Sequence, residues 1–288
     1  MASFDRLQAV GLDRFRVFAE GLDHPEGVAW GLDGFVYAGG EAGQIYRVSL
    51  NGRVEEVANT GGFILGLAFD GEGLLYACDL DRHEVVRVNV DTGNVDTYSS
   101  GTADVPMRTP NYPAFDARGS LYVTDSGAWH ANDGLIFRVA PGGRTEVWSR
   151  DAPRFPNGCC LSIEGDALLV NESTLPGLSR VEILQDGSAG RIETVAELPF
   201  VPDGVQLAED GTILVSCYRP DRIYRIPPGG EPEVLVEDPE GTLIAAPTNV
   251  AFGGPGLDTL FVASLGRWHL TVGEVGLRGA PLRYPKLA

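Results

Sequence analysis

The sequence predicts an all-β protein, a six-bladed β-propeller of four-stranded blades closed by an N-terminal strand. Three observations support this fold class. The 288 residues include 38 glycines and 19 prolines, which indicates many turns. One strand–turn–strand–loop–strand pattern recurs six times at a period of roughly 46 residues. No segment longer than a turn has the apolar spacing of a helix.

Each copy of the repeat begins with a short apolar strand, followed by an Asp/Gly turn and a second apolar strand. The six copies span residues 27–50, 66–90, 112–140, 158–184, 204–227 and 249–275. The first strands are predicted to end at Trp30, Phe69, Phe115, Leu161, Leu207 and Phe252. This regular spacing predicts that each copy forms one blade of the propeller.

A fourth strand per blade and a closing strand complete the predicted ring. Polar-alternating stretches follow four of the copies, at residues 53–59, 94–100, 144–150 and 191–198. The sixth copy lacks such a stretch, and residues 15–21 resemble the missing strand, which would cover an exposed sheet edge. We therefore predict a single domain over residues 15–278, between an N-terminal tail (1–14) and a C-terminal tail (279–288).

The charge and composition exclude several classes of function. A formal net charge of −18 disfavours binding to nucleic acid and to anionic membranes. The only lysine is Lys286, near the C-terminus, so a P-loop or a Schiff-base enzyme is not expected. The sequence shows neither a signal peptide nor a membrane span, and its four cysteines form no CxxC pair. A cytoplasmic protein is the expectation.

Polar residues recur four positions before the ends of the first strands. These positions hold Glu26, Leu65, Asn111, Asn157, Asp203 and Thr248. Propeller topology places them where the strands start, near the central channel. The Glu, Asn and Asp side chains offer hard oxygen donors, which suit Ca²⁺, whereas a zinc site would recruit His or Cys. The alternative is that Asn and Asp beside proline are ordinary turn formers.

Four motifs make the chain recognisable. PEGVAW (25–30), PNGCCL (156–161), PDGVQL (202–207) and TNVAFGG (248–254) resemble the family of gluconolactonase, regucalcin and luciferin-regenerating enzyme. The resemblance extends over roughly residues 22–265. It implies that Glu26, Asn157 and Asp203 bind a divalent cation and that Asn111 contacts the metal, water or substrate. It also implies that Asp203 is the base that activates water.

The predicted function is therefore a divalent-metal-dependent hydrolase of lactones or related esters with a small-molecule substrate. The cation would polarise the carbonyl. Ca²⁺ is the expected ion, with Zn²⁺, Mg²⁺ and Mn²⁺ as alternatives. Two other classes stay open: a non-hydrolytic lyase, isomerase or condensing enzyme on the same scaffold, and a Ca²⁺-responsive binding module. The oligomeric state is also open.

The loops between second and third strands should form the rim of the pocket. Candidate substrate contacts there, besides Asn111, are Trp129, His130, Arg219 and His269. By resemblance to paraoxonases, His130 or His269 is a candidate proton shuttle, although a loop histidine can also simply be solvated. His24, beside the PEG motif, is expected to orient Glu26 from outside the ligand set.

Overall fold

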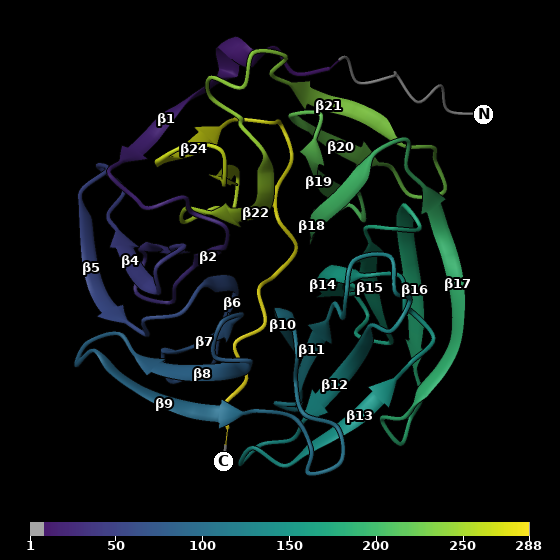
Figure 1. Cartoon of the computed structure of the whole chain (residues 1–288). Coiled ribbons are helices and arrows are strands. Elements are labelled where there is room, and N and C mark those ends of the chain that lie inside the picture. Colours follow the sequence, from purple (N-terminus) through teal and green to yellow (C-terminus); the bar gives the residue numbers. More distant parts are fainter. Residues whose placement is uncertain (1–8, 288) are drawn as a thin grey trace.

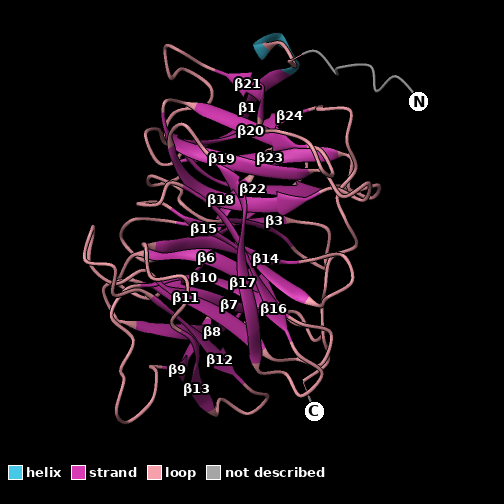
Figure 2. Ribbon diagram, turned by 90° about the vertical axis from the view of Figure 1, so that its right-hand side faces the viewer, coloured by secondary structure: helices cyan, strands magenta, loops and turns pink. Residues whose placement is uncertain are grey.

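The computed structural model describes residues 9–287, so residues 1–8 of the predicted N-terminal tail and residue 288 lie outside the described part. Six four-stranded antiparallel sheets are arranged in a ring around a central axis (Figure 1), and residues of the six innermost strands line a cavity along this axis, the channel. Seen from the side, the loops project from the two faces of this ring (Figure 2). The predicted fold class, a six-bladed propeller of four-stranded blades, is confirmed.

Each blade runs from an innermost strand outward. Blade 1 comprises β2 (Val28–Trp30), β3 (Val36–Gly39), β4 (Gln44–Val48) and β5 (Val54–Asn59). Blade 2 comprises β6 (Ile64–Phe69), β7 (Leu74–Asp79), β8 (Glu84–Asn89) and β9 (Asn94–Ser99). Blade 3 comprises β10 (Pro110–Phe115), β11 (Leu121–Asp125), β12 (Leu135–Val139) and β13 (Thr145–Ser149).

The second half of the ring repeats the arrangement. Blade 4 comprises β14 (Pro156–Leu161), β15 (Ala167–Glu172), β16 (Gly177–Ile183) and β17 (Ala189–Glu197). Blade 5 comprises β18 (Val201–Leu207), β19 (Ile213–Arg219), β20 (Arg222–Ile226) and β21 (Glu233–Glu237). Blade 6 comprises β22 (Pro247–Gly253), β23 (Thr259–Ser264), β24 (His269–Gly273) and β1 (Phe15–Glu20).

The ring is closed by the N-terminal strand, as predicted. Strand β1 pairs antiparallel with β24, from Phe15 opposite Gly273 to Glu20 opposite His269. The first strand of the chain therefore becomes the outer strand of the last blade, and the sixth sheet gains its fourth strand from the other end of the sequence. A short 3₁₀ turn, Leu12–Arg14, precedes it.

The core lies between the blades. Each buried apolar cluster combines side chains of two neighbouring blades, and aromatic pairs cross these contacts: Tyr37 meets Phe69 with ring centroids 4.8 Å apart, and Tyr76 meets Phe115 at 5.0 Å. Packing of this kind fixes the innermost strands, and hence everything they carry, relative to one another.

The C-terminal segment, residues 279–287, crosses the channel on the lower face, where the innermost strands end. It is the yellow chain that runs through the middle of the ring in Figure 1. Hydrogen bonds join Ala280 to Leu207, Arg283 to Ser162, the Tyr284 hydroxyl to the Trp30 carbonyl, and Gly71 to Pro285. A further hydrogen bond joins Gly279 to Leu257 of blade 6, so the segment, predicted as a simple tail, holds five blades together on the lower face.

No helix among residues 9–287 is long and apolar enough to span a membrane.

Candidate metal centre

The predicted ligand positions lie on the upper face, the face at which the innermost strands begin; Glu26 lies just before β2, and the others lie at β-bulges. The strand register shifts between Pro110 and Tyr112, and the residue skipped is Asn111. The same irregularity includes Asn157 in β14, Asp203 in β18 and Thr248 in β22. A bulge leaves part of the strand unpaired and changes the direction of the side chain there. Blades 3 to 6 therefore direct a polar group in the same way.

The predicted ligands are buried but have unpartnered oxygen atoms. Glu26, Asn111, Asn157 and Asp203 are each exposed to 7% or less. One oxygen of each side chain has no hydrogen-bond partner among the described residues: Glu26 Oε2, Asn111 Oδ1, Asn157 Oδ1 and Asp203 Oδ1. Buried polar atoms are nearly always paired, so four unpaired acceptors at equivalent positions indicate a missing electropositive partner.

The amide nitrogens of the two asparagines are tied down, which fixes where their oxygens point. Asn111 Nδ2 donates to Ser126 Oγ at 3.1 Å, and Asn157 Nδ2 donates to Ser173 Oγ at 3.3 Å. Both serine hydroxyls then donate to a backbone carbonyl of the next blade, that of Pro156 or Pro202. Each amide therefore presents its oxygen, rather than its nitrogen, as the free atom.

The two carboxylates destabilise each other's charge. Burial raises the pKa of Glu26 well above its usual range, and the nearby Asp203 charge raises it further. Burial also raises the pKa of Asp203, while Asn157 lowers it. Two buried carboxylates in electrostatic contact cannot both ionise cheaply without a cation. A divalent cation bound between the two carboxylates would stabilise both in their ionised forms.

The donor set fits a hard cation. All four side chains offer oxygen, two are carboxylates, and no His or Cys side chain shares their ring of positions. Ca²⁺ accepts carboxylate and amide oxygens in this mixture and leaves positions for water or substrate. The residues present therefore fit the implied ion.

A family model described as the SMP-30/gluconolactonase/LRE-like region matches residues 13–266. The chain belongs to the SMP-30/gluconolactonase/LRE-like family. Among curated relatives, the strictosidine synthase-like 6 protein of Arabidopsis thaliana is 28% identical over 210 residues, 66% of this chain and 55% of that protein. Lactonase drp35 of Staphylococcus saprophyticus is 25% identical over 175 residues, 56% of this chain and 53% of that protein. The chain spans about half the length of these relatives.

Two solved structures show the same fold. A gluconolactonase from Xanthomonas campestris has a TM-score of 0.78 at 17% identity and covers 91% of this chain and 89% of its own. A calcium-binding protein, regucalcin, from Agrobacterium tumefaciens has a TM-score of 0.75 at 17% identity and covers 98% of this chain and 99% of its own. This SMP-30/gluconolactonase/LRE-like chain thus has the same fold as both structures, although its sequence identity to each is low.

Two further buried asparagines near the centre were not predicted as ligands. Asn249 is 1% exposed, and neither Oδ1 nor Nδ2 has a hydrogen-bond partner within normal geometry among the described residues. Its amide nevertheless lies beside the Glu26 carboxylate, whose pKa it lowers. Asn171 donates through Nδ2 to the carbonyls of Asp203 and Gly204, at 2.9 and 3.0 Å. The register of the repeat could have revealed Asn171, because Thr124 and Ser216 occupy the same position in their blades and make similar bonds.

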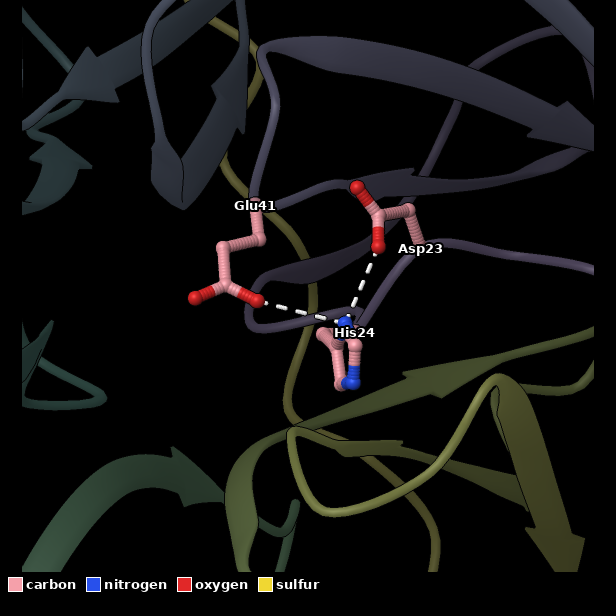
Figure 3. A group of neighbouring side chains, drawn as sticks. All are labelled: Asp23, His24 and Glu41. Carbon is pink, nitrogen blue, oxygen red and sulfur yellow. Dashed lines mark hydrogen bonds and ion pairs between the residues drawn. The ribbon is translucent and has the colours of Figure 1, made fainter.

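His24 belongs to a cluster on the rim. Its Nδ1 lies 2.9 Å from Asp23 Oδ1 and 3.2 Å from Glu41 Oε2 (Figure 3). Trp268 Nε1 donates to His24 Nε2 at 2.8 Å, so Nε2 is the acceptor and Nδ1 carries the proton. The hydrogen bonds of His24 thus go to rim residues, and the geometry gives no support to its predicted role in orienting Glu26.

The predicted substrate contacts differ in exposure. Trp129 is 50% exposed and its ring packs edge-on against Phe155, with centroids 4.8 Å apart. His130 beside it is exposed. Arg219 is exposed too, but forms an ion pair of 3.2 Å with Asp221. Trp129 and His130 lie in the loop between β11 and β12, and Arg219 ends β19; all three are on the upper face, where a substrate could reach them.

His269 is the exception. It is buried, and its Nε2 lies 3.0 Å from the Leu243 carbonyl oxygen. Strand β24 starts at His269, beneath the loop that enters β22. That loop, which contains Leu243, covers the imidazole of His269. The geometry therefore gives no support to a substrate contact or a proton-shuttle role for His269.

Proposed function

We propose that this chain is a divalent-cation-dependent hydrolase of lactones or related esters. The observation that carries the proposal is the set of four unpartnered buried oxygens, delivered by four blades to the upper end of the channel. Glu26, Asn157 and Asp203 would hold the ion, with Asn111 completing the set. Ca²⁺ is the ion these donors favour, and when bound it supplies Lewis-acid polarisation of the substrate carbonyl.

Asp203 is the proposed base. Its unpartnered Oδ1 would face the cation, which leaves the second carboxylate oxygen to take a proton from a water molecule. The water oxygen bonds to the carbonyl carbon, the C–O bond of the ester breaks, and the proton passes from Asp203 to the departing alkoxide oxygen. The Asn157 amide lies beside the Asp203 carboxylate and lowers its pKa. Ser173 accepts a hydrogen bond from Asn157 Nδ2 and so fixes that amide, which keeps the base in place.

The substrate should be neutral, with an apolar body. Among residues 9–287, three large aromatic side chains are well exposed, and all lie on the upper face: Trp129, Tyr218 and Trp268, at 50%, 39% and 65% exposure. Four arginines on this face pair within the protein: Arg82 with Glu84, Arg108 with Asp133, Arg219 with Asp221, and Arg267 with the Gly241 carbonyl. Arg154, in the loop that enters β14, has an exposed side chain. The face therefore offers rings for packing and few cations for gripping an anion.

A panel of lactones tests this proposal. Purified, Ca²⁺-loaded protein is assayed with aromatic lactones, alkyl lactones and sugar lactones of equal ring size. We expect aromatic substrates to have the highest kcat/KM. Trp129→Ala and Trp268→Ala should raise KM for them severalfold while changing kcat for a small unsubstituted lactone little. The proposal is contradicted if no lactone in the panel is hydrolysed. It is also contradicted if both variants keep the KM of the parent protein for the aromatic lactones.

A second candidate function comes from the relatives, since three strictosidine synthase-like proteins match at 26–28% identity. A non-hydrolytic enzyme of this fold would consume a substrate without taking up water. Hydrolysis in H₂¹⁸O separates the two, because only a hydrolase introduces the label into the product carboxylate. Cation binding without any turnover would instead favour a binding module.

A further inference from the structure

Asn249 occupies a special position in the repeat, the one directly after the bulged ligand residue. Four blades have glycine there: Gly27, Gly66, Gly158 and Gly204. A Cβ atom added at Gly204 would lie 2.6 Å from the Thr248 carbonyl oxygen and 2.7 Å from Asn249 Oδ1. The position therefore faces the neighbouring blade at contact distance, and a side chain there must fit between two blades.

In blade 6 that side chain is an amide wedged between the two blades that carry carboxylates. Its Oδ1 packs over the Cα side of Gly204, the residue after Asp203 in blade 5. On the other side lies blade 1, where Thr248 Oγ1 donates to the Glu26 carbonyl at 2.7 Å and the Asn249 amide lies beside the Glu26 carboxylate. Thr248 thus holds the backbone of the glutamate whose side chain lies beside the Asn249 amide.

The isolation of the Asn249 amide is the second observation. The side chain is 1% exposed, and both of its polar atoms lack a normal hydrogen bond among the described residues. An unpaired buried amide is costly, and a leucine of similar size would remove that cost. A polar residue in this slot is therefore explained by what it does for the charged site beside it.

We infer that Asn249 is a positioning residue whose Nδ2 donates to the Glu26 carboxylate once a cation is bound, and that it thereby raises the cation affinity of the site. The inference rests on the cation site of the proposed function. A donor held by packing fixes the carboxylate in one orientation, so binding costs less side-chain entropy. With Oδ1 turned to Gly204, the group left to face Glu26 is the NH₂.

The test is a double-mutant cycle with Ca²⁺ affinity as the readout. Calorimetry on EDTA-stripped protein measures Ca²⁺ dissociation constants for the parent, Asn249→Leu, Glu26→Gln and the double variant. We expect Asn249→Leu to weaken binding about tenfold in the parent and less than twofold in the Glu26→Gln background, because the amide acts through the glutamate. Asn249→Ser, which keeps a hydroxyl donor, serves if the leucine variant does not fold.

Each other outcome overturns the inference. Unchanged affinity in Asn249→Leu makes Asn249 a packing residue only. Losses that multiply in the double variant make it an independent cation ligand. If the parent binds no Ca²⁺, the proposed cation site fails, and the cycle is then evaluated from urea unfolding in EDTA. Coupling between the two substitutions there would still support the contact between Asn249 and Glu26, and additivity would contradict it.

Discussion

Buried aspartates on the upper face have two distinct roles, which their hydrogen bonds distinguish. Asp125 accepts from the backbone N–H groups of Arg108, Thr109 and Gly127, at 2.7, 3.1 and 3.3 Å. Asp203 is equally buried, yet its Oδ1 accepts from nothing among the described residues. The Asp125 carboxylate fixes the loop that enters β10 through these hydrogen bonds. The Asp203 carboxylate is free to bind a cation or a proton.

This contrast predicts opposite effects of the same substitution. Asp203→Asn should lower the kcat/KM for lactone hydrolysis at least about 100-fold and weaken Ca²⁺ binding, because it removes a base and a charged donor. It should not lower stability in EDTA. Asp125→Asn should cost about 1–3 kcal/mol of unfolding free energy through its broken loop contacts. Urea unfolding in EDTA and calorimetry with Ca²⁺ check both, and a destabilised Asp203→Asn protein would contradict the assignment.

At the level of elements, the sequence predicted the strands well because the repeat encodes them locally. Trp30, Phe69 and Leu161 end innermost strands as expected, and residues 15–21 contain the closing strand. The register of the anchors also placed Glu26 and Asp203 correctly at the strand starts. These features follow from apolar alternation and turn chemistry, both of which are visible along the chain.

Contacts between blades were not predictable in this way. Whether the oxygen or the nitrogen of the Asn157 amide is free depends on the Ser173 hydroxyl, and Asn249 gains its neighbours only when blades 5 and 6 pack together. His269 was predicted as a rim residue because it lies near a loop, but the loop containing Leu243, from another part of the chain, covers it. The C-terminal segment has no periodic pattern, so its path across the channel was equally hidden.

The C-terminal segment should act as a second clasp of the ring. Deleting residues 279–288 removes hydrogen bonds to blades 1, 2, 4, 5 and 6 and uncovers the lower ends of the innermost strands. We expect the melting temperature to fall by several degrees, since 1 kcal/mol shifts the Tm of a chain this size by about 2–4 °C. Tyr284→Phe, which loses only the bond to Trp30, should cost about 1 kcal/mol.

Calorimetric melting in EDTA is the appropriate measurement for these variants. Ca²⁺ affinity should change little in both, because the segment lies on the face opposite the ligands. An unchanged melting temperature in the truncated protein would show that β1 alone closes the ring.

For the whole molecule, the buried acid pair sets a pH dependence of stability. The pKa of Glu26 and of Asp203 is raised in the folded state, to about 8 for Asp203. The folded protein therefore binds these protons more tightly than the unfolded chain. Their contribution is fully present below the ordinary carboxyl pKa of about 4 and is lost as pH rises through the raised values.

Metal-free protein should accordingly lose stability relative to Asp203→Asn between about pH 4 and about pH 8. Ca²⁺ at 100 times its dissociation constant should restore about 2.7 kcal/mol at the upper end. Urea unfolding across this range, with EDTA or with Ca²⁺, measures both effects. A parent protein in EDTA whose stability rises with pH relative to Asp203→Asn would contradict the sign of the shift.

The most direct test of the central claim is lactone turnover measured on the same sample before chelation, after exhaustive chelation and after Ca²⁺ is returned, with metal content determined at each step. We predict about one Ca²⁺ per chain in the active protein, loss of activity with loss of the ion, and recovery on reloading. Glu26→Gln should stay inactive at the Ca²⁺ concentration that restores the parent. Full turnover by metal-free protein would contradict the account.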